Sequence, residues 1–409
     1  MNKLIRDPEL EQLVRSLNDT GAPPETGQPA LEEQRPAAKS WPSSAVPEGN
    51  GLEPLLIEMA QRGASDLHLV AGAPPIFRIG GRLTRIDTPL SSDDIQSLLG
   101  AFTTGRLRER LDEEGSADFS LRLGRTSADG DHRGWRFRVN VHRQRGTLAA
   151  AVRALPSSVP TLTELGLPAT LGELTKPTRG LVLVCGPTGA GKSTTLASMV
   201  NEINRTEARH IITIEDPIEY EHRNVESIIE QIEVGRDAPT FAGALRAALR
   251  QDPDVILVGE MRDLETVSTA LTAAETGHLI LGTLHTSDVA QAIHRIVDVF
   301  PPVQQTQIKQ QLAMSLNAIV VQQLIPRSRG EGRAVAVEVL LANNAVRNHI
   351  RNDKLQNLST EITLGKRHGM ISFEESLARL VADGHITVED ARVRSSRPDE
   401  LESVMRAAR

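Results

Sequence analysis

An eight-residue segment, Gly186 to Ser193, has the residue types and spacing of a phosphate-binding loop. Its sequence, Gly-Pro-Thr-Gly-Ala-Gly-Lys-Ser, fills every position of the pattern G-x-x-x-x-G-K-[ST]. Glycines let backbone N–H groups turn inward around phosphate oxygens, and a following helix presents its positive end to them. We expect Lys192 to reach the β- and γ-phosphates of a nucleotide and Ser193 to ligate Mg²⁺. The predicted nucleotide-binding residues are Gly186, Pro187, Thr188, Gly189, Ala190, Gly191, Lys192, Ser193 and Thr194.

The segments on both sides of this loop agree with a phosphate site. Before it, Leu181 to Cys185 is a short apolar run typical of a buried strand, and after it Thr194 to Val200 is compatible with a helix. Strand, loop and helix therefore follow in the order that the motif requires. A glycine-rich turn without chemistry is the alternative, and it would not need these neighbours.

Carboxylates follow two later predicted strands. His210 to Ile214 is followed by Glu215, Asp216 and Glu219, and the strand from Asp254 ends in Glu260. Because the carboxyl ends of parallel strands meet at one edge of a sheet, we expect these acids near the phosphate loop. They are candidates for Mg²⁺ ligation and for orienting an attacking water. Spacing alone does not choose between Glu215 and Glu219, and an acidic surface turn is the alternative.

Two histidines, His278 and His285, bracket another predicted buried strand. Seven residues of strand span ~23 Å, and an odd separation places side chains on opposite faces, so the two cannot chelate one ion. His285 lies at the carboxyl end, where it is expected to touch the γ-phosphate. His278 lies at the far end, where a structural and a functional role remain open.

The residues before the phosphate loop are predicted to form a smaller α/β domain whose last strands are rich in arginine. A hairpin with Gly80-Gly81 at its turn is predicted in this domain, and its arginines suit phosphate because the guanidinium donates two hydrogen bonds at once. A solvated strand face is the alternative. The arginines are Arg133, Arg136, Arg138, Arg143, Arg145 and Arg153.

The chain of 409 residues is long enough for several domains. We predict that residues 178–341 alternate strand and helix around a parallel sheet, with Ile308 to Val321 as a packed core helix. The predicted divisions are a disordered N-terminal extension (1–50), a small α/β domain (51–155), a linker (156–177), the nucleotide-binding domain (178–341) and a C-terminal helical subdomain (342–409).

Bulk composition excludes some classes of protein. The net charge of −7 gives no support to a nucleic-acid partner, and one cysteine allows neither an internal disulfide nor a four-cysteine zinc site. No stretch approaches the ~18 apolar residues of a membrane span. We therefore expect a cytoplasmic protein whose membrane contact is peripheral.

Four motifs together resemble the secretion ATPases: the phosphate loop, the acidic box Thr213 to Glu219, the segment Leu249 to Asp263, and the histidine box Thr276 to Thr286. Within that superfamily the chain is similar to the PilT family, the type IV pilus retraction ATPases, over about residues 52–392. The single cysteine excludes the zinc module usual in the assembly ATPases. The C-terminal signature of the PilT family, A-I-R-N-L-I-R-E, reads here Ala-Val-Arg-Asn-His-Ile-Arg-Asn from residue 345, with Arg347 and Arg351 retained and His349 and Asn352 different.

The resemblance implies an α/β fold: a RecA-like phosphate-loop ATPase domain, a smaller N-terminal PAS-like domain and a C-terminal helical subdomain. It implies that Glu219 polarises the attacking water, that Glu260 is the Walker-B-like acid holding Mg²⁺ with Ser193, and that the signature serves retraction rather than hydrolysis. Residues implied to complete the ATP site are Arg138, Arg145 and Arg153, while His278 and His285 match the histidine box, with His285 and Lys192 counted among the catalytic residues.

The resemblance further implies a homohexamer that hydrolyses ATP with Mg²⁺, acts on a PilC-like inner-membrane platform protein and so drives pilin depolymerisation at the pilus base. A second retraction ATPase is a possible partner. Alternatives within the superfamily are a PilU-like accessory retraction ATPase and a pilus or type II secretion assembly ATPase. A nucleic-acid-translocating ring motor is the alternative of another class, and the acidic charge and scarce aromatic residues argue against it.

Overall fold

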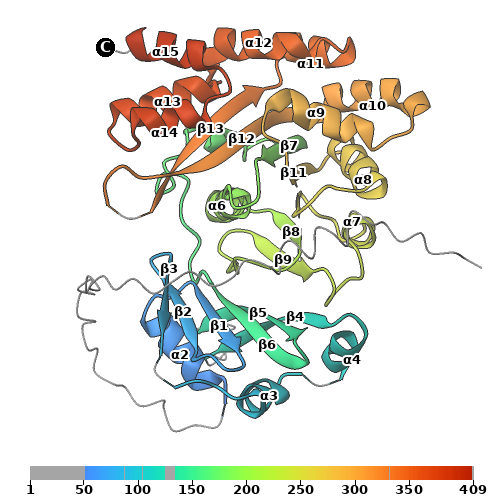
Figure 1. The fold of residues 1–409 in the computed structure, drawn as a ribbon. Coiled ribbons are helices and arrows are strands. Elements are labelled where there is room, and N and C mark those ends of the chain that lie inside the picture. The colour runs from blue at the N-terminus through green and yellow to red at the C-terminus, as the bar shows by residue number, and fades with distance from the viewer. Residues whose placement is uncertain (1–50, 87, 104, 125–133, 331, 408–409) are drawn as a thin grey trace, which may run out of the picture. The chain divides into compact units, whose positions relative to one another are not determined.

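The computed structural model describes residues 51–86, 88–103, 105–124, 134–330 and 332–407. The predicted disordered extension (1–50) and Arg133 lie outside the described residues. Two β-sheets, each with its own helices, organise the described chain (Figure 1). No helix among the described residues combines the length and the apolar character that crossing a bilayer would need.

The first sheet has six antiparallel strands in the order β3-β2-β1-β6-β5-β4. The predicted hairpin is confirmed: Gly80 and Gly81, with φ of +56° and +80°, join two paired strands. The elements of this region are α2 (Glu53–Gln61), β1 (Asp66–Val70), β2 (Ile76–Ile79), β3 (Arg82–Arg85), α3 (Ser92–Gly100), α4 (Arg106–Glu113), β4 (Ser116–Leu123), β5 (Trp135–Gln144) and β6 (Thr147–Leu155).

Strand β5 shows why the arginines share one face of this sheet. Phe137, Val139 and Val141 are fully buried in the core that covers one side. Because side chains alternate along a strand, Arg136 and Arg138 must project from the opposite side. The sheet therefore presents guanidinium groups away from its own core.

The second sheet has seven strands in the order β13-β12-β7-β11-β10-β8-β9. All neighbouring pairs are parallel except β12 with β13. Its elements are β7 (Gly180–Cys185), α6 (Lys192–Thr206), β8 (His210–Glu215), β9 (Ile228–Glu233), α7 (Phe241–Ala248), β10 (Val255–Val258), α8 (Leu264–Glu275), β11 (Leu279–Leu284), α9 (Val289–Asp298), α10 (Pro302–Ser315), β12 (Leu316–Pro326) and β13 (Arg333–Leu341).

Burial explains the apolar runs of the central strands. Every residue of β7, β10 and β11 is buried, because helices cover both faces of the sheet and form a separate core on each. The phosphate loop follows β7, which lies between β12 and β11. The loop thus follows directly on a fully buried strand in the interior of the sheet.

The prediction of one core helix over Ile308 to Val321 is wrong in its second half. Helix α10 ends at Ser315, and the apolar residues that follow form β12, which pairs with β7 on one side and β13 on the other. A strand that is buried on both faces loses the apolar–polar alternation, so its periodicity resembles that of a buried helix. Strand β9 was not predicted at all.

The stretch 156–177, predicted as a linker, is packed against the second sheet. It contains the short helix α5 (Thr170–Glu173), and four of its leucines join the core between β7 and α6. These are Leu162, Leu167, Leu171 and Leu174.

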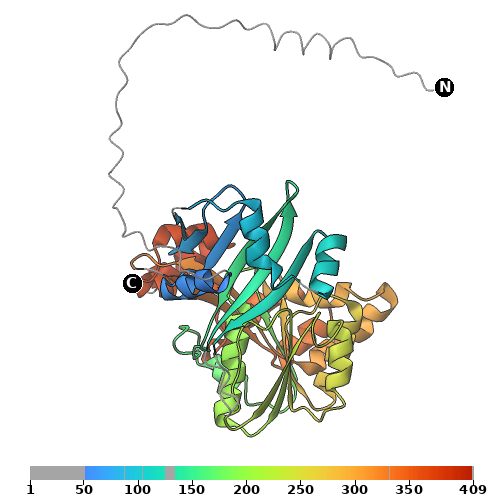
Figure 2. The same ribbon diagram turned by 90° about the horizontal axis from the view of Figure 1, so that it is seen from below.

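The C-terminal region is helical, as predicted. In Figures 1 and 2 its red helices lie beside the orange strands β12 and β13, and Phe373 and Leu377 of α13 share a core with Ile325 and Ala336 of those strands. The elements are α11 (Asn344–Arg351), α12 (Leu358–Leu364), α13 (Phe373–Ala382), α14 (Val388–Arg394) and α15 (Pro398–Ala407), with short 3₁₀ turns at Leu355–Asn357 and Gly365–His368.

Candidate nucleotide-binding site

The phosphate loop has the backbone that its glycines allow. Gly186, Gly189 and Gly191 have φ of +145°, +79° and +88°, a region that residues with a Cβ rarely adopt. A Cβ on Gly186 would lie 2.4 Å from the carbonyl oxygen of Gln322, so only glycine fits there. Helix α6 begins directly after the loop, at Lys192. The loop therefore has the curvature and the helix end that bind phosphate.

Gln322 of β12 supports this loop from the neighbouring strand. Its Nε2 donates to the carbonyl of Ala190 at 2.7 Å, and its Oε1 accepts from Thr195 Oγ1 at 2.9 Å. The side chain is fully buried, so both bonds are shielded from water. Sequence reasoning missed Gln322 because the residues around it were predicted to be helical.

Lys192, His285 and Glu260 form a hydrogen-bonded chain beside the loop. Lys192 Nζ donates to the carbonyls of Gly186 and Pro187 at 2.9 and 3.2 Å and lies 3.4 Å from His285 Nδ1. His285 Nε2 lies 2.9 Å from Glu260 Oε1. Because an ammonium group can only donate, Nδ1 must accept, and Nε2 then carries the proton that is donated to Glu260.

The pKa values of this chain follow from its surroundings. Burial lowers the pKa of Lys192. Burial and the charge of Lys192 lower the pKa of His285, so its imidazole is neutral at pH 7. A neutral His285 matches the tautomer deduced from the hydrogen bonds.

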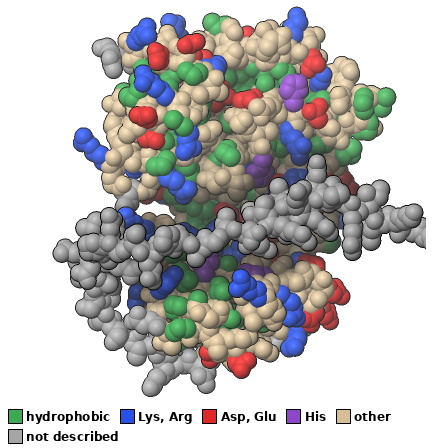
Figure 3. Space-filling model, in the orientation of Figure 1, with side chains coloured by type: hydrophobic (Ala, Val, Ile, Leu, Met, Phe, Trp, Pro, Cys, Tyr) green, Lys and Arg blue, Asp and Glu red, His purple; other side chains and the backbone are tan. Residues whose placement is uncertain are grey.

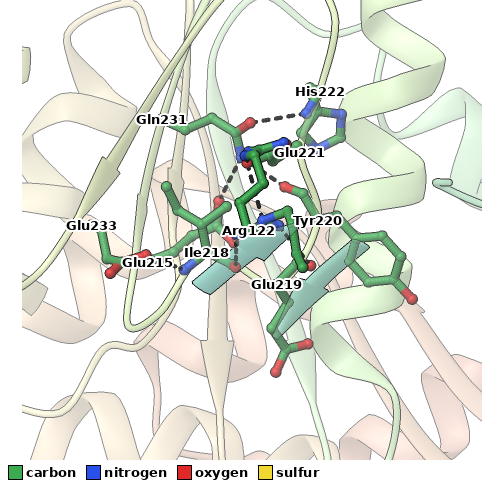
Figure 4. Close-up of polar contacts among 10 residues, drawn as sticks. Arg122, Glu215, Ile218, Glu219, Tyr220, Glu221, His222, Gln231 and Glu233 are labelled. Carbon is green, nitrogen blue, oxygen red and sulfur yellow. Dashed lines mark hydrogen bonds and ion pairs between the residues drawn. The ribbon is translucent and has the colours of Figure 1, made fainter. Parts of the chain in front are cut away.

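The structure separates the two acids that spacing could not distinguish. Glu215 accepts from Thr213 Oγ1 at 2.7 Å and from Gln231 Nε2 at 3.2 Å, and burial raises its pKa. The carboxylate of Glu219 has no hydrogen-bond partner among the described residues and lines a cavity of about 810 Å³. In Figure 4 it points away from the polar contacts that hold its neighbours. This geometry favours Glu219 as the group that meets a water.

The unpredicted strand β9 holds the loop that carries Glu219. Gln231 Nε2 donates to the carbonyl of Tyr220 at 2.8 Å, and its Oε1 accepts from the backbone N–H of His222 at 2.9 Å (Figure 4). Glu233 accepts from the N–H of Ile218 at 3.3 Å. Burial also lowers the pKa of His222 to about 4, so this imidazole stays neutral.

Two of the three predicted arginines reach the cavity. Arg138 and Arg153 line it, together with residues of the phosphate loop, and Arg153 Nε donates to Asp66 at 2.8 Å. Arg145 lies at the β5–β6 turn with φ of +48° and does not line the cavity. Arg138 and Arg153 are directly paired in the sheet, which explains why these two arrive together.

Arg136, on the same face as Arg138, contacts the acidic loop instead. Its Nη2 donates to the carbonyl of Ile218 at 2.8 Å, its Nη1 donates to that of Glu219 at 3.3 Å, and its Nε lies 3.0 Å from Glu221. Burial lowers the pKa of Arg136, and Glu221 opposes this effect. The arginine-rich pattern included Arg136, but nothing local distinguished its partner from a phosphate.

The histidine box is divided between the two ends of β11. His285 joins the phosphate loop, whereas His278 Nδ1 lies 3.0 Å from the carbonyl of Ala273, in the last turn of α8. The same carbonyl also accepts the backbone N–H groups of Thr276 and of His278 at 3.2 Å, so the imidazole adds a further bond at this helix end. His278 thus has a structural contact far from the cavity.

The donors at the cavity fit an ion that is bound mainly through phosphate. Ser193 and Glu260 both line the cavity, yet the described residues include no group of three His, Cys, Asp or Glu side chains that could hold a metal. Mg²⁺ commonly takes one or two protein ligands and completes its shell with substrate oxygens and water. The predicted pair therefore matches a nucleotide-bound Mg²⁺ rather than a closed protein site.

The C-terminal signature lies on α11, where Arg347 donates to the carbonyls of Ala313 and Met314 at the end of α10. Both residues that differ from the family pattern make local contacts. His349 Nε2 lies 3.3 Å from Glu361 of α12, and Asn352 donates to the carbonyl of Asn348 at 2.9 Å. The substitutions are thus accommodated within the helical subdomain.

A glycine loop between β7 and α6, a free acid after β8 and another acid after β10 meet at one edge of a largely parallel sheet, which defines a phosphate-loop ATPase. Residues 124–392 match the model of the type II/IV secretion system protein family, and the chain belongs to this family. Within it, the chain is a PilT-type ATPase.

Relatives cover most of the chain. It is 44% identical over 348 residues to the type IV pilus retraction ATPase PilT of Pseudomonas aeruginosa, and the matched region covers 85% of this chain and 98% of the relative. It is 39% identical over 350 residues to the type IV pilus ATPase PilU of the same organism, and the matched region covers 85% of this chain and 90% of PilU. A crystal structure of the pilus retraction motor PilT with bound ADP is 47% identical, with a TM-score of 0.78 and coverage of 86% and 99%.

Proposed function

We propose that the chain binds ATP with Mg²⁺ in the cavity at the carboxyl edge of β7 and hydrolyses it to power retraction of type IV pili. The observation that carries this proposal is the placement of Glu219: a carboxylate without a hydrogen-bond partner in the described chain lines the same cavity as Lys192 and Ser193. A PilT relative with bound ADP supports the choice of nucleotide.

Each residue of the cavity then has a task. The glycine loop binds the phosphates through its N–H groups, and Lys192 exchanges its contacts with the carbonyls of Gly186 and Pro187 for phosphate oxygens. Glu219 orients the attacking water and accepts its proton. Ser193 and Glu260 would hold Mg²⁺, which would neutralise phosphate charge.

The proposal includes a homohexameric ring in which hydrolysis changes how two domains pack. Arg138 and Arg153 come from the antiparallel sheet and line the cavity with Lys192 and His285. Loss of the γ-phosphate would remove a ligand shared by these four side chains and allow the domains to repack. The ring would act at the cytoplasmic side of the inner membrane, on a platform protein at the pilus base.

A deletion of the gene in its host tests the retraction motor. The expected result is hyperpiliation together with loss of twitching, because pili are still assembled but not withdrawn. Loss of surface pili would instead identify an assembly ATPase. Restoration of both properties by the wild-type gene is the control.

A PilU-like accessory role is the second candidate, which the 39% identity to PilU supports. A strain whose other retraction ATPases are deleted separates the two roles: a self-sufficient motor still retracts pili, and an accessory one does not. A nucleic-acid-translocating motor has no such support, because basic and acidic side chains are interspersed on the face drawn in Figure 3. Absence of ATPase stimulation by single-stranded DNA would exclude this alternative.

A further inference from the structure

The loop that carries Glu219 is held from two sides. Strand β9 holds it through Gln231 and Glu233. From the other side, Arg136 donates to the two successive carbonyls of Ile218 and Glu219, at 2.8 and 3.3 Å. Arg136 is therefore bound to the backbone of the proposed catalytic residue itself, and its partner is not the nucleotide.

Charge and burial make this contact specific for arginine. The Arg136 side chain is only 10% exposed, and Glu221 of the same loop pairs with it at 3.0 Å and also with Arg122 of β4 (Figure 4). A planar guanidinium can donate to two carbonyls and a carboxylate at once, whereas a lysine ammonium has no such fork. Two arginines of the antiparallel sheet thus neutralise one acid of the catalytic loop.

We infer that Arg136 is a positioning residue for ATP hydrolysis: it fixes the backbone at Ile218 and Glu219, so that the N-terminal sheet places the carboxylate of Glu219 toward the cavity. This inference rests on the proposed role of Glu219. It goes beyond that role because it assigns the antiparallel sheet a contribution to hydrolysis that is made through the protein backbone and not through a contact with phosphate.

Loss of Arg136 should lower kcat and leave nucleotide binding intact. A displacement of about 1 Å at a catalytic group costs up to ~10²-fold, so Arg136→Ala is expected to reduce kcat roughly tenfold to a hundredfold with the KM for ATP within about twofold. Arg136→Lys should fall between Arg136→Ala and the wild type. Melting temperatures of both variants, measured by calorimetry, establish that the proteins are folded.

The matched control lies on the same strand. Arg143 of β5 also contacts a backbone carbonyl and an acid, but both, Leu111 and Asp112, belong to its own domain. Arg143→Ala should therefore leave kcat and KM within about twofold of the wild type. An equal loss of kcat in Arg143→Ala and Arg136→Ala would show that the first sheet is needed only for general stability, and would overturn the inference.

The deciding experiment repeats Arg136→Ala in a Glu219→Gln background. If Arg136 acts through Glu219, the second change should lower the residual rate less than about twofold, because two residues that act as one unit are not additive. If Arg136→Ala lowered kcat by the same factor in both backgrounds, the inference about Arg136 would be overturned while the proposed role of Glu219 would stand. A raised KM with unchanged kcat in Arg136→Ala would have the same meaning. Full activity of Glu219→Gln would overturn the proposed catalytic role of Glu219 and the inference with it.

Discussion

Two cavities lie at opposite ends of β7, and they differ in the charged residues that line them. The larger, of about 810 Å³, follows the carboxyl end of the strand and is lined by Lys192, Ser193 and Glu219. The smaller, of about 420 Å³, lies at Gly180, where the strand begins, and is lined by Arg347 of the C-terminal signature. The two ends of this six-residue strand are about 17 Å apart.

One residue at each cavity illustrates the difference, Glu219 at the first and Arg347 at the second. Glu219 has no hydrogen-bond partner in the described chain, whereas Arg347 donates to the carbonyls of Ala313 and Met314. A cation that binds the last carbonyls of a helix stabilises that helix end. We propose that one end of the sheet performs hydrolysis and that the other end transmits its effect to the pilus machinery. The variants of Lys192, Glu219 and Arg347 described next test that division.

Lys192→Ala should have the largest effect and abolish ATP hydrolysis. The variant loses the cation expected at the β- and γ-phosphates, and no other lysine of the described residues lines the cavity. A phosphate-release assay at saturating ATP measures it. Lys176→Ala, at an exposed pair with Glu173, is the control and should retain full activity. Hydrolysis by Lys192→Ala at the wild-type rate would remove the first cavity from the mechanism.

Glu219→Ala should lower kcat by ~10²-fold or more while ATP still binds, because orienting and deprotonating the water is lost but the phosphate loop is intact. Glu215→Gln is the informative partner. Glu215 is bonded to Thr213 and Gln231, and an amide of the same shape preserves part of those contacts, so a loss below about tenfold is expected. A larger loss in Glu215→Gln than in Glu219→Ala would reverse the assignment of the two acids.

The double variant Arg347→Ala, Arg351→Ala should spare hydrolysis and abolish pilus retraction. Neither residue lines the larger cavity, so kcat should stay within about twofold of the wild type, while twitching is lost. Arg406→Ala, at an exposed pair with Glu402, is the control and should change neither property. A parallel fall in ATPase activity and twitching would mean that α11 has only a structural role, and the proposed division would fail.

Local patterns predicted the parts of this site that are contiguous in sequence. The phosphate loop, the strand before it and the helix after it were foreseen because the motif itself fixes glycine conformations and a helix start. The hairpin at Gly80-Gly81 was predicted for the same reason. The fold class followed from the alternation of strand and helix.

Contacts between distant segments were not predictable from these patterns. Gln322, Gln231 and Arg136 each act on a loop that is brought to them by sheet pairing, and nothing in their neighbouring residues specifies that partner. The segment after Ser315 was assigned to a helix because a doubly buried strand has no alternation. The choice between Glu215 and Glu219 needed hydrogen bonds, which spacing does not contain.

The smallest expected effect is a pH-dependent change in stability, and it comes from Glu338, a carboxyl group that lines neither cavity. Glu338 of β13 is buried, and burial raises its pKa to about 7, although Arg397 opposes this effect. Glu374, which pairs with Arg397 at 2.7 Å, and Asp288 at the start of α9 also face it. Since its pKa in the folded state exceeds the ordinary 4.5, its stabilising contribution is complete below about pH 4.5 and is lost as pH rises through about 7.

Glu338→Gln should therefore gain thermal stability relative to the wild type as pH is raised from 5 to 8, since the amide stays neutral throughout. One pKa unit corresponds to ~1.4 kcal/mol, so a difference of a few degrees in Tm is expected at pH 8, with kcat unchanged. Glu402→Gln, at an exposed pair with Arg406, should show no such trend. If the Tm difference between Glu338→Gln and the wild type were the same at both pH values, ionisation of Glu338 would not be coupled to folding. A change in kcat would extend the catalytic region beyond the first cavity.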